Sequence, residues 1–360
     1  MSETRYDWLA DRWVIFAPHR SQRPDEFVTN ALPYVPPSAI CPFCAGHEHL
    51  TPGEVLSLPR RASRCEPWKV RVVPNKYPAL DPLPELFPQP TFRSYESEAL
   101  SGNLAHVYAN VATIELPKTS VLFNRRQLQG AHEVVIESPE HLNSLTEVSE
   151  GHARLVFEAF RRRLIHWRAH DSLHYSVVFK NVGPEAGASL SHSHSQLIAT
   201  NFVPPDVQRS CQRQKQFLEQ YQRGYFSELI AQELKAKERI ILQSPSFVAV
   251  VPFASQMPYF VLILPRVQQA RFEEVSDRIL AEFSTVVRRV LRALETLFPS
   301  VAYNFVLHTS PFNECWEGVF HWRMEIFPRL TKVAGFEWGS DCFINPVLPE
   351  FAAKQLSKWA

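Results

Sequence analysis

The sequence predicts an α+β fold made of two tandem half-units, residues 1–200 and 201–360. The chain is long enough for a doubled domain, and its 45% hydrophobic content is enough for a sizeable core. Each half contains the same order of patterns, which is two strands, one helix and two further strands. Both expected helices follow an acidic residue and carry apolar side chains at helical spacing.

The elements of the first half are expected at 69–73, 132–137, 148–170 (the helix), 173–179 and the segment around His192. Those of the second half are expected at 247–252, 259–265, 274–297 (the helix), 301–307 and 320–326. A polar helical pattern over 206–235 bridges the halves, and 82–103 is a long proline-rich loop. The arginines of the two helices are expected on solvated outer faces: Arg161, Arg162, Arg163, Arg288, Arg289 and Arg292.

Composition and charge argue against several classes of protein. The 38 basic and 37 acidic residues balance, so nothing favours a nucleic acid or a membrane surface as partner. We find no run of about 18 apolar residues and no signal-peptide pattern. Six cysteines in 360 residues do not make a disulfide scaffold, and we expect cytoplasmic thiols.

The most informative segment is 191–196, Ser-His-Ser-His-Ser-Gln. Residues two apart on an extended chain point the same way, so His192, His194 and Gln196 are expected on one face. Such a face suits metal ligation or nucleophilic attack on phosphorus, because imidazole is nucleophilic near neutral pH. Gln196 could donate its amide hydrogens to a phosphoryl oxygen that gains charge. The alternative is a polar strand with solvated histidines.

The same strand recurs in the second half with different chemistry. Aligning the halves puts His192 opposite His321, His194 opposite Arg323, and Gln196 opposite Glu325. We therefore expect the first half to be catalytic. The second half is expected to be a diverged copy that completes the sheet or binds substrate.

Cys41 and Cys44 have the C-x-x-C spacing of a zinc knuckle. A redox pair is the alternative, although no thioredoxin-like pattern surrounds them. Spacing alone leaves the other ligands open: His47 and His49 are close in sequence, whereas His132, His141 and His192 are far away. Two thiolates and two imidazoles would make a closed, structural site.

The chain resembles the galactose-1-phosphate uridylyltransferase family of the histidine-triad superfamily, over nearly its whole length. Its motifs occur in order at 18–24 (PHRSQRP), 41–44 (CPFC), 74–80 (PNKYPAL), 138–141 (SPEH), 181–183, 191–196, 250–253 (VVPF) and 335–337 (GFE). The resemblance implies a duplicated histidine-triad (HIT-like) fold with antiparallel sheet and helices. It also implies that nucleotide sugars and sugar phosphates are the substrates, and that a homodimer is possible.

The resemblance also assigns site residues. It implies one structural Zn²⁺ on Cys41, Cys44, His141 and His192, with His47 and His49 as bystanders. It makes His194 the nucleophile that forms a nucleotidyl-histidine intermediate. The residues that it places on substrate are Gln196, Ser189, Arg20, Arg23, Asn75, Asn181, Phe336 and Glu337.

Two departures from the family pattern affect the predicted substrate. The uridylyltransferases proper usually have proline and glycine where Ser193 and Ser195 stand here. The His-Ser-His-Ser-Gln form of this chain, together with segment 330–337, looks closer to the plant-type ADP-glucose phosphorylase branch. A second family metal site is expected to be lost, because its positions carry Cys211 with Gln214, Ser246 and Arg323, with His308 alone retained.

The leading hypothesis is transfer of a nucleotidyl group between sugar phosphates, of the UDP-glucose–hexose-1-phosphate uridylyltransferase type. The first alternative is adenylyl transfer from ADP-glucose to phosphate. A non-catalytic nucleotide-binding protein is the second, and cleavage of dinucleoside polyphosphates is the third. The base of the nucleotide and the acceptor stay open at this point.

Overall fold

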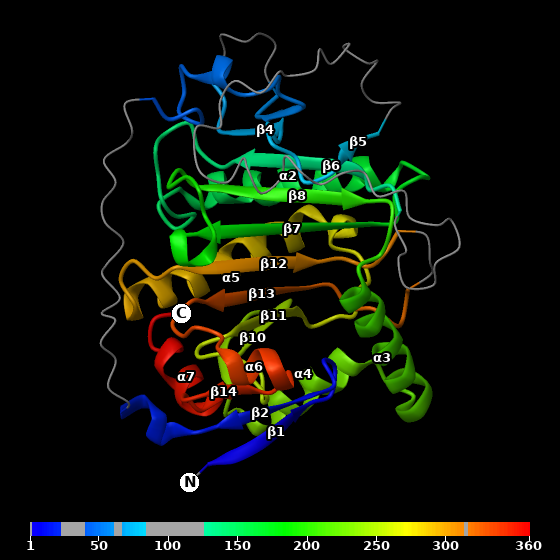
Figure 1. The fold of residues 1–360 in the computed structure, drawn as a ribbon, viewed down its shortest axis with the longest axis vertical. Helices are drawn as coiled ribbons and strands as arrows, with labels where there is room; N and C mark the ends of the chain where they lie inside the picture. Colours follow the sequence, from blue (N-terminus) through cyan, green and yellow to red (C-terminus); the bar gives the residue numbers. More distant parts are fainter. Residues whose placement is uncertain (1, 23–39, 61–66, 84–125, 313–315) are drawn as a thin grey trace, which may run out of the picture.

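The fold was obtained as a computed structural model, which describes residues 2–22, 40–60, 67–83, 126–312 and 316–360 (Figure 1). Arg23 and residues 84–103 of the expected proline-rich loop lie outside these ranges. No helix in the described part of the chain is both long and apolar enough to cross a membrane. The α+β class with antiparallel sheet is confirmed.

One 11-stranded sheet runs through both halves (Figure 1). Neighbours along it are antiparallel, except that β5 (Asp81–Pro82) pairs parallel with β6. Its order is β3 (Leu56–Leu58), β4 (Val70–Pro74), β6 (Gln129–Ile136), β8 (His194–Thr200), β7 (Tyr175–Val182), β12 (Tyr303–His308), β13 (Arg323–Pro328), β11 (Val261–Pro265), β10 (Phe247–Val250) and β9 (Ile240–Gln243). The strands expected from the sequence are present, with ends that move by up to four residues.

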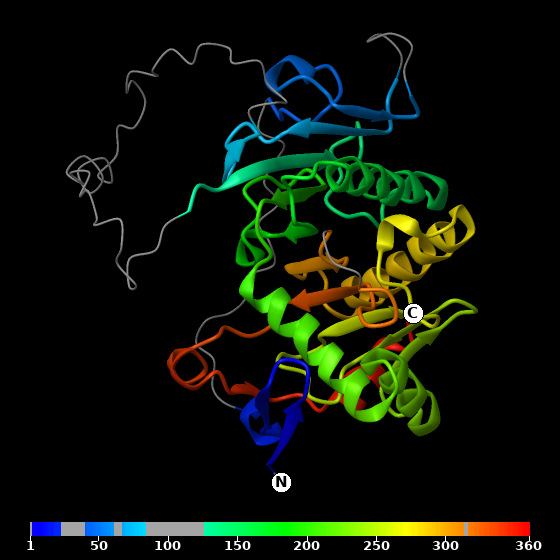
Figure 2. The same cartoon turned by 90° about the vertical axis from the view of Figure 1, so that its right-hand side faces the viewer.

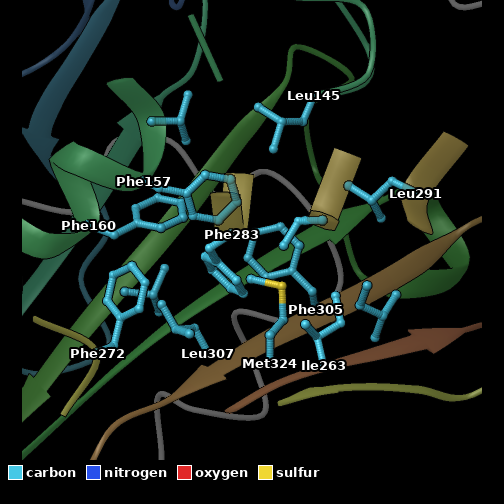
Figure 3. Close-up of a cluster of buried hydrophobic side chains, with 14 of the residues drawn as sticks. Leu145, Phe157, Phe160, Ile263, Phe272, Phe283, Leu291, Phe305, Leu307 and Met324 are labelled. Carbon is cyan, nitrogen blue, oxygen red and sulfur yellow. The ribbon is translucent and has the colours of Figure 1, made fainter. Parts of the chain in front are cut away.

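The two long helices α2 (Glu150–Arg168) and α5 (Asp277–Leu297) lie together on one face of this sheet (Figures 1 and 2). Each begins at a serine N-cap: Ser149 accepts from the backbone N–H of His152, and Ser276 accepts from that of Ile279. Their apolar stripes pack onto the strands, as Figure 3 shows for Phe157, Phe160 and Phe283.

Smaller elements complete the fold. The polar bridge forms α3 (Pro205–Tyr221) and α4 (Tyr225–Ala236). A second sheet joins β1 (Glu3–Asp7), β2 (Arg12–Phe16) and β14 (Phe343–Asn345), and the C-terminal region adds α6 (Gly335–Ser340) and α7 (Pro349–Leu356). Short 3-10 turns are η1 (Pro18–Gln22), η2 (Glu48–Leu50), η3 (Pro184–Ala186) and η4 (Phe272–Glu274).

The register of the sheet relates the two halves. At the central β7–β12 pair, Phe179 lies opposite Val306. Phe179 is also opposite Gln196 on β8, and Val306 is opposite Glu325 on β13. The two strand pairs are therefore equivalent about an approximate two-fold axis at Phe179 and Val306. This register confirms the internal alignment of His192, His194 and Gln196 with His321, Arg323 and Glu325.

The prediction that the helix arginines are all solvated is wrong for two of them. Arg163 is buried and donates to both carboxylate oxygens of Glu133, at 2.9 and 2.5 Å. Arg288 is buried and donates to the carbonyl of Val148 at 2.6 Å. These side chains lie where the helices meet the rest of the core, and periodicity does not reveal which polar residue finds a buried partner there.

The division at residue 200 stays a prediction. One sheet crosses it, and a single hydrophobic cluster contains residues of both halves, including Leu145, Phe305, Leu307 and Met324 (Figure 3).

Candidate functional site

The candidate metal ligands come together at the start of β8. One potential ligand atom from each of Cys41, Cys44, His141 and His192 lies within 4.8 Å of the others. Cys41 Sγ is 3.5 Å from His192 Nδ1, and Cys44 Sγ is 3.5 Å from His141 Nδ1. This cluster can hold a metal ion.

Hydrogen bonds outside the cluster orient both imidazoles. His192 Nε2 lies 2.9 Å from the carbonyl of Ser138, which can only accept, so Nε2 carries the proton and Nδ1 is left with a lone pair. His141 Nε2 lies 3.1 Å from the hydroxyl of Ser191. Such outer contacts are typical of histidines that bind a metal. The donor set therefore fits a closed tetrahedral site for Zn²⁺.

Protonation states agree with this fit. Burial lowers the pKa of His192 to about 4, so the ring is neutral at pH 7, as a ligand must be. Burial, with smaller effects of a hydrogen bond to the Cys41 sulfur and of the charge there, raises the pKa of Cys44 to about 11. A metal must therefore displace a proton from this thiol, and its affinity will increase with pH.

The local alternative for the ligands is excluded. The ring of His47 contacts the carbonyl of Cys41 at 2.8 Å through Nδ1, and His49 packs edge-on against His47. Neither belongs to the group that could hold a metal. His132, another distant candidate, lies elsewhere in the site.

His194 is the first residue of β8 and is almost fully buried. Its Nδ1 lies 2.7 Å from the carbonyl of His192, so Nδ1 carries the proton and Nε2 keeps its lone pair. Burial, with a smaller effect of Lys180, lowers its pKa, so the ring is neutral at pH 7. The ring of Phe43 packs edge-on against it, with centroids 5.2 Å apart. His194 therefore has the protonation and orientation of a nucleophile.

Gln196 lies on the same side of β8, one alternation further along the strand. Its Oε1 accepts from His132 Nε2 at 2.8 Å, and Asn75 Nδ2 lies 3.5 Å away. The backbone N–H of Ala79 donates to His132 Nδ1 at 3.2 Å, which leaves the proton on Nε2. The oxygen of the carboxamide is thus occupied, and its amide group has no hydrogen-bond partner among the described residues.

Two further predicted residues lie in this half. Asn181 is near the end of β7, where its Oδ1 accepts from Asn304 Nδ2 at 2.7 Å. Ser189 is exposed in the loop that leads to His192. That loop turns at Gly183 and Gly187, whose φ values of 81° and 83° favour glycine.

The other predicted substrate residues lie at the opposite end of the molecule. Arg20 is exposed on η1, directly after β2, and Phe336 and Glu337 are on α6 beside β14 (Figure 1). The β2–β14 sheet packs near Ala254, just beyond β10. Five strand spacings separate β10 from β8, or about 24 Å at roughly 4.8 Å each. One chain therefore does not bring these residues to His194.

Two residues of the site were not predicted from the sequence. Phe43 lies between the C-x-x-C cysteines and contacts the rings of both His192 and His194. His132 was considered only as a distant metal ligand, and it orients Gln196 instead. The alternation of β6, which puts His132 and Val134 on one face, is the only local signal that could have found it.

The second half has a pocket on its own part of the sheet. A cavity of about 440 Å³ lies between β1, α4 and the strands β11 and β13. Phe226, Leu262 and Glu325 are among its lining residues. Glu325 is the equivalent of Gln196, whereas Arg323, the equivalent of His194, is not among the lining residues.

The chain matches two family models in succession. Residues 1–204 match the N-terminal domain of galactose-1-phosphate uridyl transferase, and residues 207–336 match its C-terminal domain. The chain belongs to the galactose-1-phosphate uridyl transferase family, a class of nucleotidyltransferases.

Individual relatives extend this result. The chain is 33% identical to ADP-glucose phosphorylase of Arabidopsis thaliana, over 98% of this chain and 91% of the relative. It is 28% identical to galactose-1-phosphate uridylyltransferase of Thermotoga maritima, over 99% and 98%. A crystal structure of the Arabidopsis ADP-glucose phosphorylase with bound ADP-glucose superposes with a TM-score of 0.78 at 32% identity, covering 100% of this chain and 99% of that one.

Proposed function

We propose that this protein transfers a nucleotidyl group from a nucleoside diphosphate sugar to a phosphate acceptor, through a covalent intermediate on His194. The observation that carries the proposal is the geometry at the start of β8. His194 is held by Nδ1, and neither its Nε2 nor the amide group of Gln196 on the same face has a hydrogen-bond partner among the described residues.

The reaction has two displacements at one phosphorus. His194 Nε2 attacks the α-phosphorus, a P–N bond forms, and the P–O bond to the sugar phosphate breaks. The phosphate oxygen of the second substrate then attacks the same phosphorus, and the P–N bond breaks. The amide of Gln196 donates to the phosphoryl oxygen that gains charge, and little acid catalysis is needed because the leaving phosphate is a stable anion.

The metal cluster supports this site without taking part in the chemistry. We infer that Cys41, Cys44, His141 and His192 hold one Zn²⁺. All four positions would be filled by protein, so the ion would fix the loop of residues 41–44 against His192, next to the nucleophile. We place the reaction in the cytoplasm, where the two thiols stay reduced.

Two choices of substrate follow from the family. The first is uridylyl transfer between UDP-glucose and a hexose 1-phosphate, which is supported by both family models. The second is adenylyl transfer from ADP-glucose to phosphate. It is supported by the 33% identity to ADP-glucose phosphorylase and by Ser193 and Ser195 in the histidine motif.

We also propose that a second copy of the chain completes the site. Arg20, Arg23, Phe336 and Glu337 are the proposed contacts to nucleotide and hexose, and the three that are described lie too far from His194 of their own chain. Phe336 is 50% exposed and neighbouring Trp338 is 79% exposed, and large exposed aromatic side chains are typical of interfaces. In a homodimer, α6 of one copy could reach the β8 site of the other.

The test is to incubate the protein with UDP-glucose or ADP-glucose and to look for an acid-labile adduct on His194 by intact mass. A UMP adduct that galactose 1-phosphate discharges supports uridylyl transfer, and an AMP adduct that phosphate discharges supports the phosphorylase reaction. Absence of an adduct with either would contradict both and favour a nucleotide-binding protein. Mixing a His194→Gly chain with a Glu337→Ala chain tests the shared site, because restored activity requires one chain to supply each residue.

A further inference from the structure

A buried polar cluster lies directly behind His194, on the sheet face that α2 and α5 cover. Lys180 on β7 donates to Glu137 Oε2 at 2.7 Å, to Ser193 Oγ at 2.9 Å and to the carbonyl of His194 at 3.1 Å. The hydroxyls of Ser193 and Ser195 donate to Glu137 at 2.6 and 2.5 Å. Each of these four side chains is at most 4% exposed. All three ammonium hydrogens of Lys180 are therefore used inside the core.

The equivalent positions in the second half are apolar. By the two-fold relation of the halves, Lys180 corresponds to Leu307, Ser195 to Met324 and Ser193 to Trp322. Leu307 and Met324 lie in the hydrophobic cluster of Figure 3. The fourth position, Glu137, corresponds to Pro265. The same backbone is thus built without any charge at these sites.

This contrast distinguishes what the fold requires at these positions from what the function requires. A buried ion pair gains little over well-packed apolar residues, because desolvation offsets the Coulomb attraction. The second half shows that this fold accepts the apolar solution. The first half keeps the charged side chains. They lie next to its proposed histidine nucleophile, which the equivalent position of the second half lacks.

The cluster holds the chain on both sides of His194. Lys180 binds the carbonyl of His194 itself. The backbone of Ser193 donates to the carbonyl of Leu142 at 2.6 Å and accepts from the N–H of Glu137 at 3.2 Å. The peptide between His192 and Ser193 is therefore fixed, and its carbonyl is the group that binds His194 Nδ1 at 2.7 Å.

We propose that Lys180, Glu137, Ser193 and Ser195 form a positioning cluster that directs His194 Nε2 at the α-phosphorus. The inference rests on the proposed function. It also explains the two serines in the motif, because proline or glycine at these positions cannot donate to Glu137.

The main test replaces the charged pair by neutral side chains, Lys180→Met with Glu137→Gln, in the full-length protein. Single-turnover formation of the nucleotidyl-histidine adduct should slow on the order of 10²-fold, since misplacement by about 1 Å has such an effect. The nucleotide sugar concentration that gives half the maximal rate should not change. A parental rate would overturn the inference.

A matched control is available in the same half. Arg163 and Glu133 form another buried ion pair, between α2 and β6, with no contact to His194. Arg163→Met with Glu133→Gln should change the melting temperature and leave the rate of adduct formation unchanged. Equal slowing by both double variants would overturn the inference, because the effect would then be general loosening.

Two further measurements keep the test decisive. If the double variant does not fold, Ser195→Ala removes one hydroxyl and should slow adduct formation about tenfold, the effect of one hydrogen bond to a charged group. An unchanged rate in that variant would again overturn the inference. The second measurement is ¹⁵N NMR of the histidine, which reports whether His194 keeps its proton on Nδ1.

The NMR measurement separates the two proposals. If the parent protein forms no adduct with either sugar nucleotide, the proposed function fails. The positioning cluster is then judged by the tautomer alone, which should be Nδ1–H in the parent and mixed in the Lys180→Met, Glu137→Gln variant. A single unchanged tautomer in the variant would overturn the inference that the cluster positions His194.

Discussion

In the N-terminal half, β8 carries His194 and Gln196; in the C-terminal half, β13 carries Arg323 and Glu325 at the equivalent positions. Arg323 Nε donates to Glu325 Oε1 at 2.7 Å, and His308 Nε2 lies 3.2 Å from Glu325 Oε2. These groups contact one another, whereas Nε2 of His194 has no partner in the part of the chain that the structure describes. The shared backbone therefore supplies the position, and the side chain decides whether the position is reactive.

His192 and His321 show how much of the metal centre comes from the fold. His192 Nε2 contacts the carbonyl of Ser138 at 2.9 Å, and His321 Nε2 contacts that of Pro265 at 2.8 Å. Burial lowers the pKa of each to about 4. Only the other nitrogen differs: His321 Nδ1 has no hydrogen-bond partner among the described residues, and His192 Nδ1 faces two cysteines. The imidazole orientation belongs to the fold, and the loop at 41–44 adds the two thiols of the candidate metal cluster.

The open faces of the two halves differ as well. In the second half, α4 packs Phe226 and Ile230 onto Val248, Val250 and Leu262 of the sheet. The same face of the first half is left for His194 and Gln196. Covering a sheet face with a helix buries apolar surface but removes access for a substrate. In the second half, α4 covers the position where the first half carries His194 and Gln196.

The largest effect is expected from the nucleophile. His194→Gly should abolish nucleotidyl transfer, by at least about 10³-fold, because the proposed intermediate is a P–N bond to this residue. The fold should persist, and circular dichroism with the melting temperature checks this. Turnover close to normal would remove His194 from the mechanism.

The metal centre gives the next largest effect. Cys44→Ser should lose the metal and lower the free energy of unfolding by several kcal/mol, because ligand binding is linked to folding. His321→Ala, the counterpart change in the second half, should keep the full metal content. Metal per chain is measured by inductively coupled plasma mass spectrometry, and full occupancy in Cys44→Ser would point to another site.

The ionic cluster of His308, Arg323 and Glu325 in the second half should affect the stability of the protein and not the rate of its reaction. Arg323→Met leaves the largely buried Glu325 without its nearest partner, which should cost about 3 kcal/mol in urea unfolding. The rate of adduct formation on His194 should not change in the folded protein. A slower chemical step in this variant would mean that the second half contributes to catalysis.

The same cluster predicts a dependence of stability on pH. Burial raises the pKa of Glu325, but His308 and Arg323 outweigh it, so the pKa lies well below its usual range. The stabilisation is present above the unfolded value of about 4.3 and is lost as pH falls toward the folded value. Glu325→Gln should reduce the loss of stability between about pH 5 and 2 by roughly 1–2 kcal/mol. Identical pH profiles of parent and variant would contradict this.

The smallest effect concerns the support of Gln196. His132→Ala removes the bond to Oε1, so the carboxamide can turn away from the phosphoryl oxygen. Adduct formation should slow about tenfold, the value of one good hydrogen bond in the transition state. Rapid chemical quench of a single turnover measures the rate of adduct formation. A change in substrate affinity without a change in rate would assign His132 to binding instead.

The sequence by itself determined the local patterns and the doubled order of elements. The alternation of His192, His194 and Gln196, the C-x-x-C spacing and the helical spacing of apolar residues all depend on near neighbours in the chain. For that reason the alignment of the two halves and the positions of α2 and α5 were predictable. Spacing left the metal ligands open, and the family resemblance pointed to the four that the structure brings together.

The tertiary structure decided which distant residues meet. Cys44 reaches His141 across 97 positions and Cys41 reaches His192 across 151, which only the register of the sheet can arrange. The same register gave Gln196 its partner His132. It also divided the predicted substrate contacts between two ends of the molecule.

The fate of charged side chains was decided by the tertiary structure too. Arg163 lies in a run of arginines that looks solvated, and Lys180 lies in a strand whose pattern does not mark it as buried. Each is buried because a carboxylate from β6 or its end lies opposite, Glu133 for one and Glu137 for the other. Burial of a charge requires a partner in space, and local sequence does not specify that partner.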